Sequence, residues 1–240
     1  MTETAVDPRG AEVHHTHRDV AGGWLRPAVF GAMDGLVSNV ALIAGIAGAG
    51  ASRHGVILAG LAGLLAGAFS MAVGEWTSVH SQSELVRSEI AKERRELVRK
   101  PAAERAELAA LYRHRGLSVE LADQVARELS RDPESLWRIH VREELGVDPD
   151  NLASPYVAAG SSFLSFAVGA LVPMLPYVAG AQMLWPTLIV AAVDLVALGA
   201  AVSRFTERPW WQGAARQLAL GAAAVGITYG VGSAFGVGLN

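Results

Sequence analysis

The sequence of 240 residues predicts an all-α integral membrane protein, with five transmembrane helices and a cytoplasmic helical insert between spans two and three. Two observations carry this prediction. Hydrophobic residues make up 51% of the chain, and the 18% of charged residues are segregated. Residues 81–150 hold most of the charges, whereas residues 155–203 contain Asp194 as their only acid or base. Such segregation is typical of a membrane protein that carries one polar domain.

Five stretches satisfy the requirement of a membrane span for about 20 predominantly apolar residues. They lie at about 27–49, 55–79, 156–178, 183–203 and 213–237. The first begins at Pro27, which suits the first position of a helix. The second carries small residues that favour close helix contact in lipid, Gly60, Gly63 and Gly67. The third holds Pro173 and Pro176 near its end, which predicts a broken helix buried among the others.

Basic residues beside the spans predict the orientation of the chain. Arg18 and Arg26 precede the first span, and Arg204 and Arg208 lie between the fourth and fifth. The loops on the opposite side contain only Arg53. By the positive-inside rule, the N-terminus and the insert lie in the cytoplasm and the C-terminus lies outside. The N-terminal segment is polar and has no short apolar core, so it is not expected to be a signal peptide.

The polar insert is predicted to be helical throughout. No proline and only one glycine, Gly74, lie between residues 70 and 99, so the second span is expected to continue into the cytoplasm as one helix. Further helices are expected at about 101–115, 118–131 and 133–146. This gives four parts: a flexible tail 1–26, spans one and two in 27–80, a metal-binding domain 81–155, and spans three to five in 156–240. An insert of this size is too small for a generous core, so docking on a second copy would help it.

Acidic residues in the insert recur at helical spacing. Each of three predicted helices carries a group of candidate ligands: Glu93 and Glu96 on the first, Glu104 and Glu107 on the second, His140, Glu143 and Glu144 on the last. If these faces converge, their carboxylates could hold a divalent metal that prefers oxygen ligands. The alternative is a solvated surface of Glu–Arg pairs, since Arg87, Lys92, Arg94 and Arg95 are interleaved with the acids.

Two acids and a methionine stand out near the membrane. Asp34 lies within the first span, where an ionised carboxylate costs about 3 kcal/mol on insertion scales and should face a cavity or a partner. Met71 and Glu75 are four residues apart on the second span and share a helix face. A carboxylate beside a thioether suits Fe²⁺ or a similar late divalent ion. The alternatives are ordinary packing for Met71 and a structural ion pair for the acids; Asp194 is a further candidate for the pathway.

Several other functions find little support in the sequence. The net charge of −3 argues against a nucleic-acid partner. There is no cysteine, no nucleotide-binding loop with its lysine, and no zinc-protease or serine-nucleophile motif, so an enzyme is not predicted. A short histidine tract in the tail, His14, His15 and His17, could bind metal or simply be solvated.

Four stretches of the chain resemble the vacuolar iron transporter family and its bacterial members: FGAMDGLVS, GEWTSVHSQSEL, ERREL with a second helix that ends in RG, and REELG. The resemblance runs from about Arg18 to the C-terminus in the same order and spacing. It implies a homodimer of five-span subunits that moves Fe²⁺, and often Mn²⁺, out of the cytoplasm in exchange for protons. It also implies that the insert holds metal ions between the two subunits, with no permanently bound cofactor.

The resemblance also assigns roles to individual residues. The two E-x-x-E pairs of the family match Glu93 with Glu96 and Glu104 with Glu107, and the acid on its last insert helix matches Glu144, with Glu143 beside it. Asp34 and Met71 match pathway residues on the first two spans, and Glu75 lies in the GE pair at the lower end of the second. Where some members have methionines, this chain has His140 and Val141; a histidine still binds Fe²⁺ or Zn²⁺.

The resulting hypothesis is a proton-coupled exporter of Fe²⁺, possibly also of Mn²⁺, in a bacterial plasma membrane. The insert would capture the ion, and Glu75, Met71 and Asp34 would bind metal and protons in turn. The alternative is a membrane-anchored metal sensor or storage partner that binds metal without transport. A transporter of a non-metal solute would leave the repeated carboxylate pairs unexplained.

Overall fold

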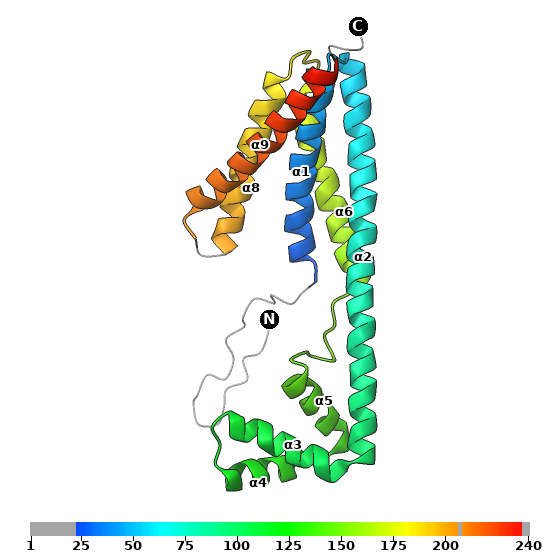
Figure 1. The fold of residues 1–240 in the computed structure, drawn as a ribbon, viewed down its shortest axis with the longest axis vertical. Coiled ribbons are helices and arrows are strands. Elements are labelled where there is room, and N and C mark those ends of the chain that lie inside the picture. Colours follow the sequence, from blue (N-terminus) through cyan, green and yellow to red (C-terminus); the bar gives the residue numbers. More distant parts are fainter. Residues whose placement is uncertain (1–22, 206–207, 237–240) are drawn as a thin grey trace, which may run out of the picture.

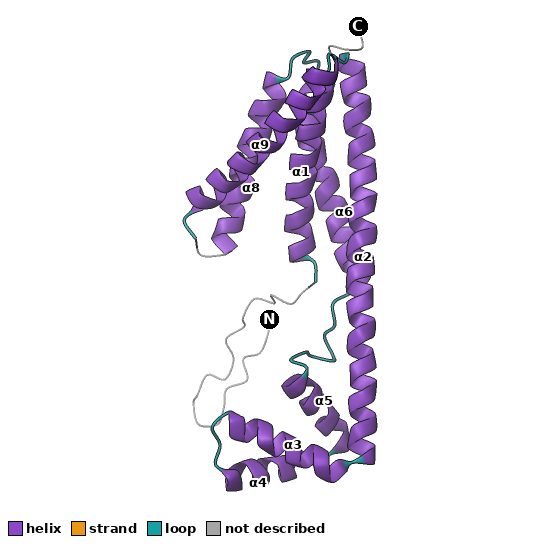
Figure 2. Cartoon of the chain, viewed as in Figure 1, coloured by secondary structure: helices purple, strands orange, loops and turns teal. Residues whose placement is uncertain are grey.

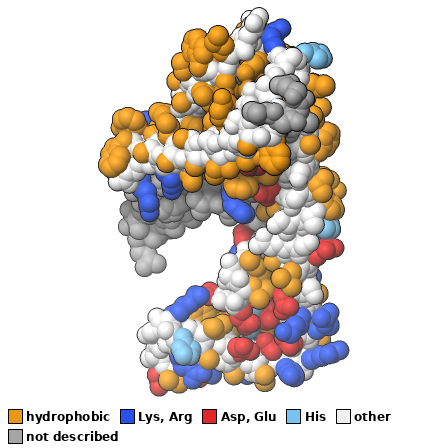
Figure 3. All heavy atoms as spheres, turned by 45° about the horizontal axis from the view of Figure 1, so that its top comes forward, with side chains coloured by type: hydrophobic (Ala, Val, Ile, Leu, Met, Phe, Trp, Pro, Cys, Tyr) orange, Lys and Arg blue, Asp and Glu red, His pale blue; other side chains and the backbone are white. Residues whose placement is uncertain are grey.

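The computed structural model describes residues 23–205 and 208–236, and these contain helices and no strand (Figures 1 and 2). The chain forms a bundle of long apolar helices, with three short helices hanging from one end of it (Figure 1). On the face drawn in Figure 3, most coloured side chains of the bundle are hydrophobic, whereas acidic side chains gather at the end of the molecule that holds the short helices. The predicted all-α class is therefore confirmed.

Five helical segments are long and apolar enough to cross a membrane, which confirms the five predicted spans. They are α1 (Leu25–Gly48), α2 (Arg53–Arg99), α6 (Pro155–Leu171) continued by η1 (Val172–Met174) and α7 (Leu175–Val178), α8 (Trp185–Phe205) and α9 (Trp210–Gly236). Spans α1 and α6 begin at the end of the bundle that carries the short helices, and α8 ends there (Figure 1). Successive spans therefore alternate in direction, as consecutive crossings of a membrane must.

Helix α1 lies at the centre of the bundle and packs most closely against α6. A Cβ atom at Gly35 would overlap the backbone oxygen of Phe166, and one at Gly169 would overlap the backbone oxygen of Ala32. Only glycine lets two helix backbones approach this closely, which is a common way to pack helices in lipid. This contact fixes the position of Asp34, which lies one residue before Gly35.

The glycines of α2 serve the same purpose, as their spacing predicts. Gly60 faces Met174, Gly63 faces Leu42, and the ring of Phe166 occupies the space beside Gly67. Leu64 and Ala68, each directly after one of these glycines, are buried in the same interface. Helix α2 is thus held against both α1 and the broken third span over its membrane part.

The third span breaks at its prolines, as predicted. Pro173 follows the end of α6 and lies buried in the short 3₁₀ helix η1. Arg53, at the start of α2, donates hydrogen bonds to the backbone oxygens of Tyr177 at 2.7 Å and Val178 at 3.0 Å. A cation at this position satisfies free carbonyls at the end of α7 and interacts well with the helix dipole. The single arginine between the first two spans therefore has a structural partner.

Helix α2 continues past the bundle without interruption and carries the insert. Its 47 residues correspond to a length of about 70 Å at 1.5 Å per residue, more than twice the ~30 Å core of a bilayer. Pro101 then begins α3 (Pro101–His114), which is followed by α4 (Val119–Leu129) and α5 (Pro133–Glu144). The side chains of Ser118 and Asp132 cap α4 and α5 by accepting bonds from backbone N–H groups.

The core of the insert is small. Leu108, Ala109 and Ala126 form one buried cluster, and partly buried side chains from α3, α4 and α5 surround it: Tyr112, Leu129, Leu136 and Ile139. Ala122, Trp137 and Val141 are buried as well. A core of this size provides limited stability.

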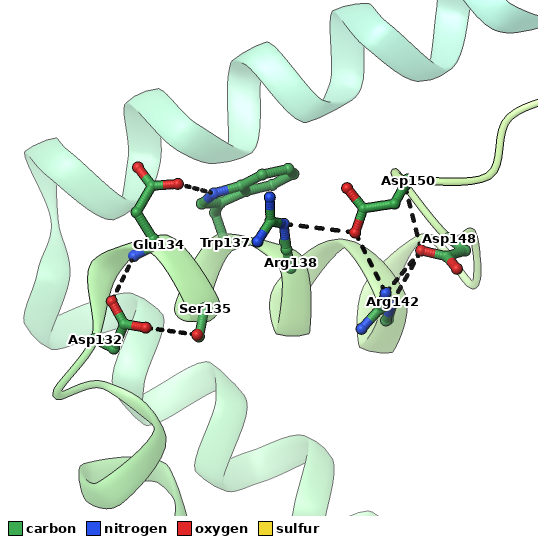
Figure 4. A network of polar contacts seen from close by, with 8 residues as sticks. All are labelled: Asp132, Glu134, Ser135, Trp137, Arg138, Arg142, Asp148 and Asp150. Carbon is green, nitrogen blue, oxygen red and sulfur yellow. Dashed lines mark hydrogen bonds and ion pairs between the residues drawn. The ribbon is translucent and has the colours of Figure 1, made fainter. Parts of the chain in front are cut away.

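A polar network fastens α5 to the loop that returns to the membrane (Figure 4). Arg142 contacts Asp148 at 2.8 Å and Asp150 at 3.5 Å, and Arg138 also contacts Asp150 at 3.5 Å. At the other end of α5, Trp137 donates a hydrogen bond from Nε1 to Glu134 at 3.4 Å. The last insert helix is therefore attached to the segment that leads directly into α6.

Candidate metal centre and membrane cavity

Four potential ligands from three helices meet inside the insert. They are Glu93 of α2, Glu104 of α3, and His140 and Glu144 of α5. One ligand atom from each lies within 4.8 Å of all the others. Three carboxylates and one imidazole at this separation can surround a single divalent ion after small side-chain movements. The faces that carry the predicted acid clusters therefore do converge.

Local sequence explains why each side chain reaches this point. His140 and Glu144 are four residues apart on α5 and share one face of that helix. The chain turns sharply after α2, and α3 begins at Pro101 directly after this turn. Glu104 lies in the first helical turn of α3. Because α3 runs away from the end of α2 (Figure 1), only its first turn, which carries Glu104, lies close to Glu93.

Three of the four residues are buried and only Glu144 is exposed, and this burial changes the acid–base behaviour of the centre. Glu93 and Glu104 are each 7% exposed. Burial raises the pKa of each of the three carboxyls, Glu93, Glu104 and Glu144, above the ordinary value for glutamate, because the charged form loses solvation. The negative charge of Glu144 raises the pKa of Glu93 further, and Glu93 does the same to Glu104. A divalent cation would replace the missing solvation and offset this repulsion.

His140 occupies the middle of the cluster and is fully buried. Its Nδ1 lies 3.0 Å from a carboxylate oxygen of Glu93 and 3.0 Å from one of Glu144. Its Nε2 has no hydrogen-bond partner within the described part of the chain. Because Nδ1 faces both carboxylates, this nitrogen is the one placed to join them in binding a metal.

The other acids predicted for this site lie around it. Glu96 is half-buried and Glu107 is exposed, and the negative charges of both raise the pKa of Glu93. Glu143 points elsewhere: it forms an ion pair with Arg115 and accepts a hydrogen bond from Tyr112 at 3.5 Å. Adjacent residues on a helix project about 100° apart, so Glu143 and Glu144 cannot both face the cluster.

A second polar site lies within the membrane part, in a cavity of 210 Å³ between α1, α2 and α6. Asp34 and Met71 both line it, so the structure brings together two of the three predicted pathway residues. Ser38 donates a hydrogen bond to Asp34 at 3.0 Å, and Ser70 lies on the α2 side. A carboxylate, a thioether and hydroxyls are together suited to a borderline divalent cation.

The remaining candidates lie outside this cavity. Glu75 is half-buried on α2, one turn from Met71 toward the insert, and is not among the lining residues. Asp194 is half-buried on α8 and does not line the cavity either. His14, His15 and His17 lie outside the described residues.

Sequence inspection did not identify three polar residues of the cavity, Ser38, Asn39 and Ser70. Asn39 is 2% exposed, which is unusual for an amide in an apolar span. The only sequence feature that could have indicated Asn39 is its position five residues after the intramembrane acid Asp34. That spacing does not place two residues on the same face of a helix, so the helical pattern gave no reason to group Asn39 with Asp34.

Comparison with known proteins gives a consistent result. The sequence model of the VIT family matches residues 25–233. The chain is 38% identical over 224 residues to "Vacuolar iron transporter" of Acanthamoeba castellanii, covering 90% of this chain and 81% of that protein. It is 31% identical over 235 residues to "Vacuolar iron transporter 1" of Oryza sativa subsp. japonica, covering 95% and 93%. With "Vacuolar iron transporter 1" of Eucalyptus grandis it shares 28% over 226 residues, covering 93% and 89%.

Proposed function

The chain belongs to the VIT family, and from this premise we propose that it carries Fe²⁺, and also Mn²⁺, out of the cytoplasm in exchange for protons. The observation that carries the proposal is the presence of two metal-compatible sites in one chain: a buried cluster in the insert and a polar cavity inside the membrane part. A protein that only anchors a binding domain has no need for an acid in a cavity among its spans.

The insert is proposed as the capture site, with Glu93, Glu104, His140 and Glu144 as direct ligands. Glu96 and Glu107 would attract the cation electrostatically or bind a further ion, since both lie close enough to affect the pKa of Glu93. Glu143 is the weakest candidate, because its ion pair with Arg115 would have to break first.

The membrane cavity is proposed as part of the transport path. Along α2, Glu75 and Met71 lie 18 and 22 residues before Glu93, which corresponds to about 27 and 33 Å at 1.5 Å per residue. An ion released by the insert would therefore travel along this helix, meet Glu75 at the entrance, and then reach Met71 and Asp34. Each carboxylate can bind either a metal ion or protons, which is the requirement for exchange.

We further propose a bacterial plasma membrane as the location, with the insert on the cytoplasmic side, and a homodimer as the working form. Arg204 and Arg208 flank the connection between α8 and α9, at the end of the bundle that carries the insert, as the positive-inside rule requires. The small core of the insert supports a dimer, since a second copy would cover more of its apolar surface.

Asp34→Asn tests the proposed function most directly. Purified protein in proteoliposomes should move Fe²⁺ and Mn²⁺ in the presence of a pH gradient. Asp34→Asn should reduce this flux to background, because a neutral amide holds a divalent cation much less strongly than a carboxylate and cannot take up or release a proton. Asp194→Asn is the matched variant, another intramembrane acid outside the cavity, and should keep most of the flux.

Two results would contradict the proposal. If the wild type binds metal but shows no flux, with or without a pH gradient, the protein is a metal sensor or store. Full flux in Asp34→Asn would remove the cavity from the pathway.

A further inference from the structure

Asn39 presents an unusual polar group to the membrane cavity. Its side chain is 2% exposed, and its Nδ2 donates a hydrogen bond to the backbone oxygen of Ala170 at 2.5 Å. Its Oδ1 has no hydrogen-bond partner among the residues that the structure describes. A buried amide that served only to join two helices would be expected to have both ends satisfied.

The chemistry of the Ala170 contact fixes which way the amide faces. The two ends of an asparagine side chain are distinguished by their hydrogen bonds, and only the NH₂ group can face a carbonyl oxygen favourably. With Nδ2 held by α6, Oδ1 faces α2, where a Cβ placed on Gly63 would lie 3.3 Å from it. Gly63 and Asn39 both line the cavity that contains Asp34 and Met71.

The position of Asn39 along α1 separates it from Asp34. Five residues correspond to about 7.5 Å along the helix axis, directed away from the end that carries the insert. An ion held by Asp34 and Met71 would have to move before Asn39 could bind it directly. An uncharged amide oxygen suits such a second position, because it can replace one hydration water without holding the ion as strongly as a carboxylate.

We propose that Oδ1 of Asn39 gives the transported divalent cation a second binding position, farther along the same cavity from Asp34. This inference rests on the proposed transport function. The ion would first bind at Asp34 and Met71 and then pass to Asn39. Gly63 places no side chain against the amide oxygen, and Leu42 packs beside this glycine. Two positions of unequal strength let an ion enter readily and still leave.

The test compares Mn²⁺ flux in proteoliposomes of the full-length protein across three variants. Asn39→Leu has nearly the same shape but neither polar group, and should lower the maximum rate by about tenfold or more while KM changes by less than about twofold, since Asp34 and Met71 are intact. Asn39→Asp keeps an oxygen but loses the donor to Ala170, and should retain flux within about threefold of the wild type. Ser162→Ala is the matched control, because Ser162 is also fully buried with an unpartnered hydroxyl but does not line the cavity.

The outcomes separate the possibilities. Wild-type rates in Asn39→Leu would overturn the inference. Equal loss of flux in Asn39→Leu and Asn39→Asp, with thermal stability lowered in both, would also overturn it and assign Asn39 to holding α1 against α6. If the wild type shows no flux, the proposed function is wrong and the inference falls with it. If Asp34→Asn abolishes flux and Asn39→Leu does not, only the inference is wrong.

Discussion

The insert and the membrane cavity use acidic residues in opposite ways. In the insert, three carboxylates and an imidazole from three helices crowd within 4.8 Å of one another around a small apolar core. In the bundle, a single carboxylate lines a 210 Å³ cavity with a thioether, hydroxyls and an amide, held by glycine contacts that bring helix backbones together. We propose that a bound cation stabilises the first arrangement and that the second lets a cation pass.

The difference follows from what each environment tolerates. The insert is surrounded by water, so acids can gather there at the cost of mutual repulsion, which a divalent cation removes. The membrane part allows few charges, so the polar groups that line its cavity are mostly neutral, and we propose that they bind the ion weakly enough for it to leave. Substitutions and pH changes at the insert cluster test whether the two sites differ in this way.

The largest effect is expected from removing charge at the insert cluster. Glu93→Gln combined with Glu104→Gln should weaken Mn²⁺ binding to the insert by about 100-fold or more, because two buried charged ligands are lost. Binding is measured by calorimetry on the full-length chain in an Asp34→Asn background, so that the membrane cavity does not contribute. Glu143→Gln is the control and should change the affinity little, since Glu143 pairs with Arg115. If Glu143→Gln weakens binding as much as the double variant does, the cluster residues are not distinguished from Glu143 as metal ligands.

A smaller effect is expected from acidification. The pKa values of Glu93, Glu104 and Glu144 are raised in the metal-free fold, so these carboxyls keep protons to a higher pH than ordinary glutamates do. Their contribution to stability is present below about pH 4.3, the ordinary pKa, and is lost as the pH rises through the raised values. Metal must displace the same protons, so it should bind more tightly at pH 7.5 than at pH 5.5.

Hydrogen exchange of residues 101–144 provides the measurement. Protection is calculated against the intrinsic exchange rate at each pH. Without metal, the protection of these amides should fall from acidic to neutral pH, and added Mn²⁺ should restore more protection at pH 7.5 than at pH 5.5. An equal gain at both values would mean that the raised carboxyl pKa values do not govern binding.

The smallest effect is expected from His140→Met, which tests the one nitrogen ligand of the cluster. Zn²⁺ affinity should fall by about tenfold, because a thioether is a weaker ligand for Zn²⁺ than an imidazole, and Fe²⁺ affinity should fall less. The two metals are compared by calorimetry in the Asp34→Asn background under anaerobic conditions. A uniform loss for both metals would indicate that His140 only fills the core of the insert.

Part of the metal centre could be predicted from sequence. Glu93, Glu104, His140 and Glu144 were all candidates, because carboxylates repeated at helical spacing mark a face of each helix. The sequence could not separate Glu144 from Glu143, since either neighbour could face inward until the angle of α5 against α2 is known. In the same way, the apolar pattern of α1 singled out Asp34 but gave no reason to expect Asn39 beside it.

The sequence by itself determined the spans, the continuous helix α2 and the order of the insert helices. These features depend on local properties: runs of apolar residues long enough for a bilayer, prolines and glycines that end helices, and side chains that cap them. Only the tertiary structure decided which donors share a site, because that depends on how separate helices cross. Glu93 meets Glu104 through the turn before Pro101, and the amide of Asn39 takes its direction from a carbonyl oxygen 131 residues away.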